Sequence, residues 1–201
     1  MFDGILRRQI DPVLDAVSQK LASAGVSANS VTLTGCALGL AAGASIAFHS
    51  FWAAAFLIAI SRLCDGLDGA IAKIRGKTDL GGYLDIVLDF VFYGAIPLGF
   101  AFADPAQNAL PAAALLFSFY INGASFLAYA IMAEKRGLQT KARGEKSLFF
   151  TTGLAEATET IAVFLLACLA PLWFPALAWG FAAVCVYTAA ARIIQAWREF
   201  G

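Results

Sequence analysis

Four aspartates stand in two neighbouring apolar segments of this sequence, as the pairs Asp65 and Asp68, then Asp85 and Asp89. Spacings of three and four residues place the two members of each pair on one face of a helix. Each carboxylate inside a hydrophobic span costs about 2.5–3.5 kcal/mol, so four of them indicate a compensating partner. If the turn between the segments centres near Lys77, both pairs lie about 12–18 Å from it. We therefore expect the four carboxylates to converge in one polar pocket.

So much negative charge in a low dielectric requires a cation. All-oxygen ligands favour Mg²⁺ or Mn²⁺, bound as one or two ions, and Ca²⁺ can take their place. The competing interpretation pairs the aspartates with Arg62, with Lys73 or with another helix. That pairing explains a single aspartate as well as a metal does, but it explains four aspartates at a matched depth less well.

The residues between the acids are small. Gly66, Gly69, Ala70 and Ala72 leave little bulk beside Asp65. This spacing fits either tight helix packing or the close approach of a flat ligand. Beside a metal site and a basic rim, it favours a bound nucleotide diphosphate, because phosphoryl transfer depends on positioning and charge neutralisation.

The elements that must position these residues are membrane helices. Apolar residues make up 60% of the 201 residues, and the mean hydropathy is +0.75. That is too much apolar surface for one water-soluble core of this size. Six runs are long enough for the ~20 residues that a spanning helix needs; they cover residues 31–49, 51–74, 81–103, 109–133, 147–170 and 174–197. We predict an all-α integral membrane protein with one domain over 1–201, whose six-helix bundle occupies 31–198.

The basic residues predict the orientation. Every Lys and Arg except Arg62 lies on one side of the predicted spans, and the loops at 49–50, 104–108 and 171–175 contain none. By the positive-inside rule both termini are cytoplasmic. Residues 1–27 alternate apolar and charged positions at helical spacing, which predicts an amphipathic helix on the cytoplasmic surface. The basic face suits membrane lipid and phosphate, and no nucleic-acid partner is expected.

The aspartate motif resembles the signature of the CDP-alcohol phosphotransferases, also called CDP-alcohol phosphatidyltransferases. That signature is Asp-x2-Asp-Gly-x2-Ala-Arg, about eight residues, then Gly-x3-Asp-x3-Asp. The matching positions here are Asp65, Asp68, Gly69, Ala72, Lys73, Gly81, Asp85 and Asp89. The six-span layout also fits, so the resemblance covers essentially the whole chain and is greatest to short proteobacterial members. It implies a bacterial inner-membrane location and a homodimer.

The resemblance also implies a reaction and roles. The enzyme would transfer a phosphatidyl group from CDP-diacylglycerol to the hydroxyl of a small alcohol, release CMP, and serve phospholipid synthesis. Asp65, Asp68 and Asp85 would hold the metal, and Asp89 would complete the metal site or act as the general base, the role that the family favours. The positions implied to contact the CDP moiety are Gly69, Ala72, Lys73, Thr78, Asn29 and Thr32. Asn29 could equally be a plain helix cap.

Two departures from the signature stand out. The family arginine is replaced by Lys73, which keeps the charge but lacks the planar fork that holds phosphate at two points. Seven residues separate Lys73 from Gly81 instead of eight. The shorter gap lies at the predicted turn, where a change of one residue is easily tolerated.

Arg62 and two further groups of residues could bind the acceptor. Arg143 and Lys146 belong to a basic cytoplasmic segment that could hold an acceptor phosphate, or that only follows the positive-inside rule. Glu156 and Glu159 lie at the predicted depth of Arg62, where they could bind acceptor hydroxyls or pair with Arg62. Asn122, Ser125 and Tyr129 could line the same cavity or join helices.

The main rival function is a divalent-cation transporter that uses the same aspartates. A transporter needs a route to the far side, yet the polar residues all lie in the predicted cytoplasmic halves. It also gives Gly69, Ala72 and Lys73 no purpose. A non-catalytic membrane scaffold does not account for so many buried acids.

Overall fold

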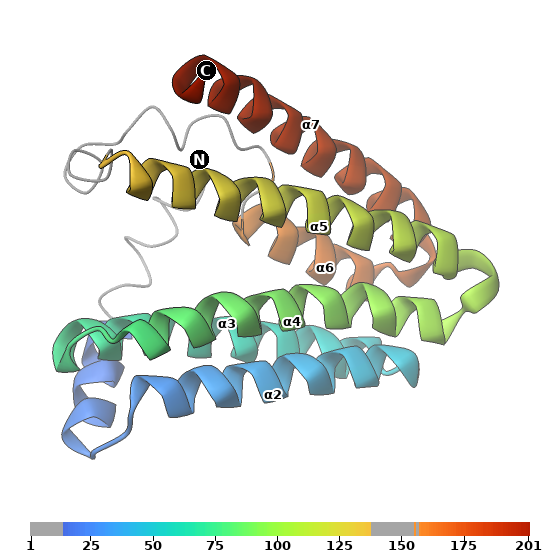
Figure 1. The fold of residues 1–201 in the computed structure, drawn as a ribbon. Coiled ribbons are helices and arrows are strands. Elements are labelled where there is room, and N and C mark those ends of the chain that lie inside the picture. Colours follow the sequence, from blue (N-terminus) through green and yellow to red (C-terminus); the bar gives the residue numbers. More distant parts are fainter. Residues whose placement is uncertain (1–13, 138–154, 156) are drawn as a thin grey trace.

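The computed structural model describes residues 14–137, 155 and 157–201, and all regular structure in these ranges is helical (Figure 1). A helix over residues 14–23 comes first. The following elements are α2 (Ala28–Ala47), α3 (Phe51–Arg75), α4 (Asp79–Ala103), α5 (Pro105–Lys135), α6 (Ala157–Leu169), the short 3₁₀ helix η3 (Pro171–Trp173) and α7 (Phe174–Phe200). The all-helical prediction is confirmed for this part of the chain.

Four of these helices are long and apolar enough to cross a membrane: α2, α4, α5 and the η3–α7 segment Pro171–Phe200. Helix α3 has 25 residues, but charged residues such as Arg62 and Asp65 lower its apolarity. The described part of α6 has 13 residues, fewer than the ~20 that a span requires. The fifth predicted span was to begin at residue 147, but 147–154 and 156 lie outside the described residues. Six spans therefore remain a prediction.

Capping residues set the ends of the helices that carry the acids. Ser27 caps α2 by accepting a hydrogen bond from the Ser30 N–H at 3.1 Å. Thr78 caps α4 in the same way, with the Gly81 N–H at 3.0 Å. Asn29 therefore lies inside α2, and the idea that it caps the helix is wrong, because Ser27 already does so. The α3–α4 turn covers residues 76–78, as the sequence predicts.

The helices form two groups (Figure 1). Helix α2 packs against α3 and α4, whereas α5 packs against α7; α4 contacts α5, and α6 contacts α3. A stripe of glycines allows α2 to approach its partners closely. A Cβ on Gly35 would lie 3.1 Å from the Cys64 Cβ, and one on Gly43 would lie 2.6 Å from the Ala95 carbonyl oxygen. A Cβ on Gly99 would in turn collide with the Gly43 backbone, so α2 and α4 touch through their main chains.

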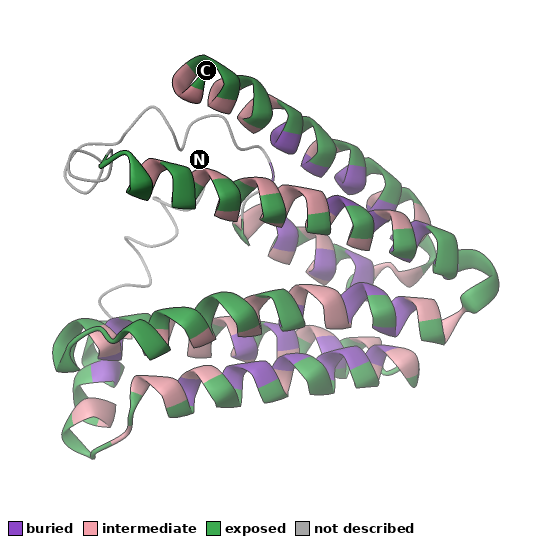
Figure 2. Ribbon diagram, viewed as in Figure 1, coloured by how far each residue is buried: buried purple, intermediate pink, exposed green. Residues whose placement is uncertain are grey.

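The described core lies mainly in one half of the bundle. Buried residues of α4 begin at Phe92, those of α5 end at Ser118, and those of α7 end at Ala189. Figure 2 shows the buried positions gathered away from the C-terminal end of α7. Aromatic rings fill this core, with Phe100 stacked on Phe174 at 4.1 Å between centroids. The α3–α4 turn and the last turn of α7 therefore stand at the less tightly packed end.

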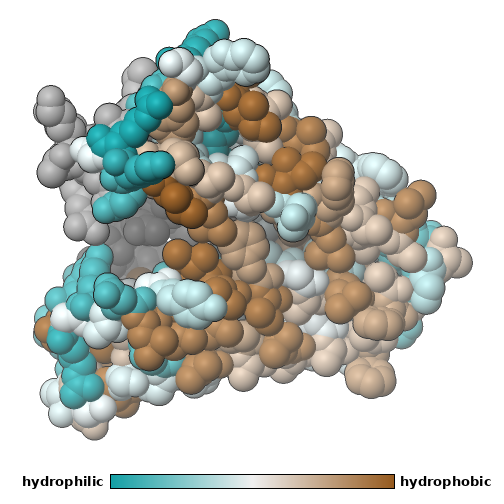
Figure 3. Space-filling view, in the orientation of Figure 1, coloured by the Kyte–Doolittle hydropathy of each residue, from teal (hydrophilic) through white to brown (hydrophobic). Residues whose placement is uncertain are grey.

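The surface has the pattern of a membrane protein. In the view of Figure 3 a broad hydrophobic band crosses the molecule, and hydrophilic residues gather at its ends. Three exposed tryptophans, Trp52, Trp173 and Trp179, lie near the end where α3 and α7 begin, and Trp197 lies at the other end. Their exposed fractions run from 51% to 80%. Tryptophan in such positions is typical of the membrane–water interface.

The described part of the N-terminal segment packs on α3. A Cβ on Gly66 would lie 3.1 Å from Leu14 Cδ1. Arg75 at the end of α3 donates to the carbonyl oxygens of Gly25 and Val26 at 3.1 and 3.0 Å. Gly25 ends the helix over 14–23 with a φ of +87°, as expected for a glycine that follows a helix. Residues 1–13 of the predicted surface helix lie outside the described residues.

Candidate functional site

The four aspartates converge as their spacing predicts. Asp65 and Asp68 come from α3, and Asp85 and Asp89 come from the facing part of α4. One carboxylate oxygen from each of Asp65, Asp85 and Asp89 lies within 4.8 Å of the other two. The α3–α4 hairpin brings the pairs level because its turn sits midway between them.

Asp68 is the buried member of the cluster. It is 4% exposed, and its Oδ2 atom has no hydrogen-bond partner. An orphaned buried carboxylate oxygen is costly and rare, so it calls for a ligand. Its side chain shares one pocket with the other three acids; the pocket is lined by Thr32, Gly35, Cys36, Ser61, Arg62, Asp65, Asp68, Asp85, Leu88 and Asp89.

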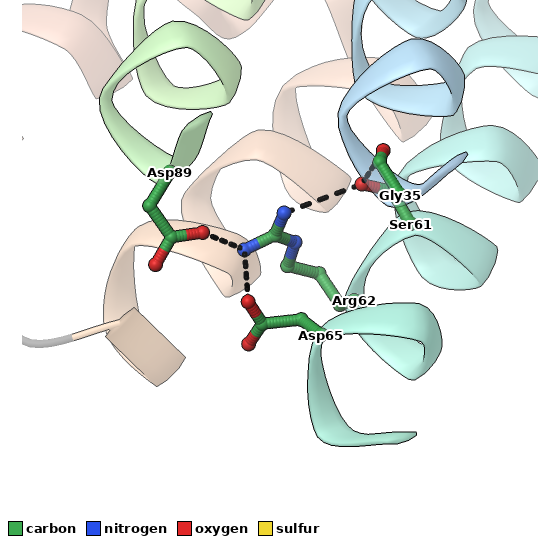
Figure 4. Close-up of polar contacts among 5 residues, drawn as sticks. All are labelled: Gly35, Ser61, Arg62, Asp65 and Asp89. Carbon is green, nitrogen blue, oxygen red and sulfur yellow. Dashed lines mark hydrogen bonds and ion pairs between the residues drawn. The ribbon is translucent and has the colours of Figure 1, made fainter. Parts of the chain in front are cut away.

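Arg62 points into this cluster from α3, one turn before Asp65 (Figure 4). Its Nη1 atom lies 2.8 Å from Asp89 Oδ1 and 3.6 Å from Asp65 Oδ1. Its Nη2 atom donates to the Ser61 hydroxyl at 3.3 Å, and Ser61 donates to the Gly35 carbonyl at 2.7 Å. The pairing of aspartates with Arg62 thus accounts for Asp89 and Asp65, but for neither Asp68 nor Asp85 among the ion pairs of the described residues.

The residues fit a divalent cation. Carboxylate oxygens are the ligands that Mg²⁺ and Mn²⁺ prefer, and opposite oxygens of an octahedral Mg²⁺ lie about 4.2 Å apart. The oxygens of Asp65, Asp85 and Asp89 all lie within 4.8 Å of one another, which is close enough for one ion to be held between them. The cavity itself has a volume of about 10 Å³, which is room for about one water molecule. It can hold an ion but not a nucleotide, which would have to lie over its open side.

The glycines of the motif differ in what they face. Gly66 meets Leu14 of the N-terminal helix and so serves packing. Gly69 is exposed, and a Cβ placed there would meet nothing within 4 Å. Ala72 is partly exposed and Lys73 is exposed on the same end of α3. The surface beside the acids therefore stays free of side-chain bulk at Gly69.

Two further predicted contacts lie beside the start of α4. A Cβ on Gly81 would lie 3.2 Å from Asn29 Oδ1 and 3.0 Å from Thr78 Oγ1, so these two side chains flank Gly81. Thr78 accepts the Gly81 N–H, which leaves its own hydroxyl hydrogen to donate. Thr32 lies in the acidic pocket. The predicted set around the motif is thus brought to one end of α2, α3 and α4.

The predicted acceptor residues are placed less fully. Arg143, Lys146 and Glu156 lie outside the described residues. Glu159 lies in the first turn of α6, and its Oε2 atom is buried without a hydrogen-bond partner. The ion pairs of Arg62 within the described ranges go to Asp65 and Asp89 and not to Glu159.

A second internal arginine joins α7 to α5. Arg192 Nη1 contacts the Asn122 carbonyl oxygen at 3.0 Å, the Asn122 Oδ1 at 3.0 Å and the Ser125 hydroxyl at 2.7 Å. Its described partners are neutral oxygens, in contrast to the carboxylates around Arg62. Sequence reasoning counted Arg192 only among the cytoplasmic basic residues. The polar Asn122 and Ser125 on α5 were the signal that could have found it.

Comparison with known proteins decides the family. A sequence model of the CDP-alcohol phosphatidyltransferases matches residues 25–194. The chain belongs to this family. The match extends over all four aspartates and ends within α7, so the predicted resemblance is confirmed. The cation-transporter alternative finds no support in these comparisons.

Two relatives align with nearly the whole length of this chain. The inner membrane protein YnjF of Escherichia coli (strain K12) is 44% identical over 193 residues, covering 96% of this chain and 94% of the relative. Archaetidylinositol phosphate synthase of Methanothermobacter thermautotrophicus is 30% identical over 208 aligned positions, covering 98% and 93%. An inner-membrane relative and four apolar helices agree with the predicted membrane protein.

Solved structures share the fold. Mycobacterium tuberculosis phosphatidylinositol phosphate synthase (PgsA1) with CDP-DAG bound has a TM-score of 0.72 and 21% identity, covering 92% of this chain and 94% of that one. The same synthase in complex with manganese and citrate has a TM-score of 0.73 and 22% identity, covering 92% and 88%. The arrangement of helices is therefore that of the family.

Proposed function

We propose that this family member transfers a phosphatidyl group from CDP-diacylglycerol to the hydroxyl of a small polar alcohol and releases CMP, in phospholipid synthesis. The observation that carries this proposal is the convergence of Asp65, Asp68, Asp85 and Asp89, at the family's spacing, in one pocket on α3 and α4. The donor is supported by the PgsA1 structure with CDP-DAG bound. Metal use is supported by the PgsA1 complex with manganese.

The acids divide the work. Asp65, Asp68 and Asp85 hold Mg²⁺ or Mn²⁺, as one or two ions, and Ca²⁺ can take their place. A bound divalent ion supplies neutralisation of charge on the donor diphosphate. The Asp89 carboxylate accepts the proton of the acceptor hydroxyl. The acceptor oxygen then forms a new bond to the lipid-bearing phosphorus, the bond from that phosphorus to the CMP oxygen breaks, and CMP leaves.

The open surface beside Gly69 is the place for the cytidine half of the donor. A flat ring can approach α3 there because a side chain is lacking and nothing lies within 4 Å. The small side chain of Ala72 lines the same surface, and Lys73 supplies a positive charge that can bind phosphate. Thr78, Asn29 and Thr32 offer hydroxyl and amide groups around the same helix ends. The acyl chains remain between the apolar helices.

For the acceptor we propose a phosphorylated polyol of the inositol phosphate class. The support is the name of the relative at 30% identity, an archaetidylinositol phosphate synthase. Arg192 is a cation inside the bundle whose described partners are neutral oxygens, so its charge suits an acceptor phosphate. Arg143, Lys146, Glu156 and Glu159 stay proposed contributors to the same acceptor site.

We further propose six spans, both termini on the cytoplasmic side and a homodimer in the bacterial inner membrane. The orientation rests on the described basic residues at helix ends: Arg75 and Lys77 lie at the α3–α4 turn, Lys135 and Arg136 at the end of α5, and Arg198 in the last turn of α7. This places the acid cluster within reach of cytosolic nucleotide. The dimer rests on the family resemblance.

The test is a CMP-release assay. The protein in detergent with Mn²⁺ receives CDP-diacylglycerol and either inositol phosphate, glycerol 3-phosphate or serine. We expect CMP that depends on one acceptor and disappears in Asp89→Asn. The matched control is Asp104→Asn, which changes the cap of α5 away from the acid cluster. Absence of CMP with every acceptor, despite measurable Mn²⁺ binding, would contradict the proposal and favour cation transport, which a vesicle uptake assay measures.

A further inference from the structure

Arg62 contacts two of the aspartates that could hold a metal ion. Its side chain is 12% exposed, and a single nitrogen, Nη1, contacts both Asp89 Oδ1 and Asp65 Oδ1. These two aspartates belong to the group of three whose oxygens could hold an ion. The guanidinium is therefore the positive charge that the acid cluster has at hand within the described chain.

The guanidinium and a divalent ion are rivals for these oxygens. An ion bound to Asp65 and Asp89 would lie within a few ångström of Nη1, where like charges repel strongly in a poorly screened pocket. Arg62 thus engages two of the three aspartates whose oxygens could hold an ion.

The arrangement with Arg62 leaves hydrogen-bonding capacity unused. Arg62 Nε and Asp68 Oδ2 are both buried and lack partners. Native proteins rarely leave such atoms unpaired, and a functional state is one reason for them. Two other contacts also position the guanidinium. The Ser61 hydroxyl accepts a hydrogen bond from Nη2, and the Arg62 Cζ lies 3.8 Å from the centroid of the Phe92 ring. Arg62 can keep these contacts while its other nitrogen leaves the aspartates.

We propose that Arg62 is a resident counter-cation that neutralises Asp89 and Asp65 before metal binds and withdraws from them when it does. The inference rests on the proposed function, since it assumes a metal at the aspartates. Arg62 is then a positioning residue. Its departure couples metal loading to the release of Asp89, the carboxylate that receives the acceptor proton.

The test measures Mn²⁺ binding to the purified protein by electron paramagnetic resonance, for the wild type, Arg62→Gln and Arg62→Lys. We expect Arg62→Gln to bind Mn²⁺ roughly tenfold more tightly. That is the gain expected if the free, metal-ready arrangement makes up about a tenth of the wild-type population. Arg62→Lys keeps the charge and should fall between the two. Arg192→Gln, which removes the other internal arginine, is the matched control and should leave Mn²⁺ affinity unchanged.

Thermal unfolding provides the second readout. In chelator, Arg62→Gln should unfold at a lower temperature than the wild type, because Asp65 and Asp89 then lack their cation. In saturating Mn²⁺ that deficit should vanish, whereas a purely structural arginine would leave it in both conditions. Unchanged or weaker Mn²⁺ binding in Arg62→Gln, with normal wild-type binding, would overturn this inference alone. Absence of Mn²⁺ binding in the wild type would overturn the metal part of the proposed function, and this inference with it.

Discussion

The two groups of helices are held together by different means. Helix α2 meets α4 through main-chain contacts at Gly43 and Gly99. Helices α5 and α7 are joined instead by side chains: Arg192 reaches Asn122, and Arg136 donates to the carbonyl oxygens of Glu199 and Phe200 at 2.9 and 2.7 Å. The Tyr129 hydroxyl also donates to the Glu199 carboxylate.

This difference matches the proposed division of labour. Glycine contacts contain no rotamers that can rearrange, so the helices around the acid cluster keep a fixed geometry, which positional catalysis requires. Side-chain hydrogen bonds can exchange one oxygen partner for another, so Arg192 in the α5–α7 pair can turn from Asn122 and Ser125 to the oxygen of an acceptor phosphate. Arg62 and Arg192 represent the two regions, one held by carboxylates and the other by neutral oxygens.

The largest effect on activity should come from replacing an acid on the rigid side of the molecule, which is formed by α2, α3 and α4. In Asp85→Asn we expect CMP release to fall by about a hundredfold or more, because the loss of a metal ligand removes several kcal/mol of charge stabilisation. Mn²⁺ binding should weaken with it. Asp79→Asn is the control, since Asp79 is exposed in the first turn of the same helix. Equal losses in the two variants would show that helix charge, not the pocket, causes the effect.

The glycine contact itself can be broken. A Cβ at Gly43 would lie 2.6 Å from the Ala95 carbonyl oxygen, so Gly43→Ala forces α2 away from α4 at a cost of about 1–3 kcal/mol. We expect the unfolding temperature in detergent to fall by about 5 °C. A Cβ at Gly94 would meet nothing within 4 Å, so Gly94→Ala should leave that temperature unchanged or raise it. The rigid-side argument fails if the two variants behave alike.

In the α5–α7 pair, a substitution should change the KM for the acceptor and leave the KM for the donor unchanged. Arg192→Gln should raise the KM for a phosphorylated acceptor by roughly tenfold, since a hydrogen bond to a charged group contributes about 1.5–3 kcal/mol. The KM for CDP-diacylglycerol should not change. Arg198→Gln, at an exposed position in the last turn of α7, controls for the loss of a basic residue. A rise in the KM for the donor alone would place Arg192 on the wrong substrate.

The smallest effect concerns the departure from the family motif. Lys73→Arg restores the guanidinium that can hold phosphate at two points, so we expect the KM for CDP-diacylglycerol to fall a few-fold. Lys77→Arg, in the exposed α3–α4 turn, makes the same chemical change away from the pocket. An identical improvement in both variants would point to surface charge instead of a contact at residue 73.

The convergence of the acids could be predicted because it depends only on spacing. Helical periodicity puts Asp65 with Asp68 and Asp85 with Asp89, and a turn at residues 76–78 brings the pairs level. What occupies the centre of the cluster could not be predicted. Whether Arg62 turns toward the acids or toward α6 depends on its rotamer and on the contacts of Ser61 and Phe92, which no sequence spacing encodes.

Other details could not be predicted from the sequence, because they too depend on local geometry. Asn29 and Ser27 are both good capping residues two positions apart, and only backbone geometry selects Ser27. The stripe Gly35, Gly39 and Gly43 is visible in the sequence, but its spacing does not say which helix it meets. Arg192 looked like one more basic residue of the cytoplasmic rim, because its partners on α5 are seventy residues or so away in the chain.

The fluorescence of the exposed tryptophans can report the orientation of the molecule in a membrane. Trp52, Trp173 and Trp179 lie near the starts of α3 and α7, remote from the acid cluster, and Trp197 lies near the end of α7. Indole emission from this chain therefore reports on the surrounding lipid and not on events at the aspartates. Lipids that carry a quencher in one leaflet would quench the emission of either three tryptophans or one. The fraction of emission lost in vesicles of known sidedness therefore reveals which end of the bundle faces that leaflet.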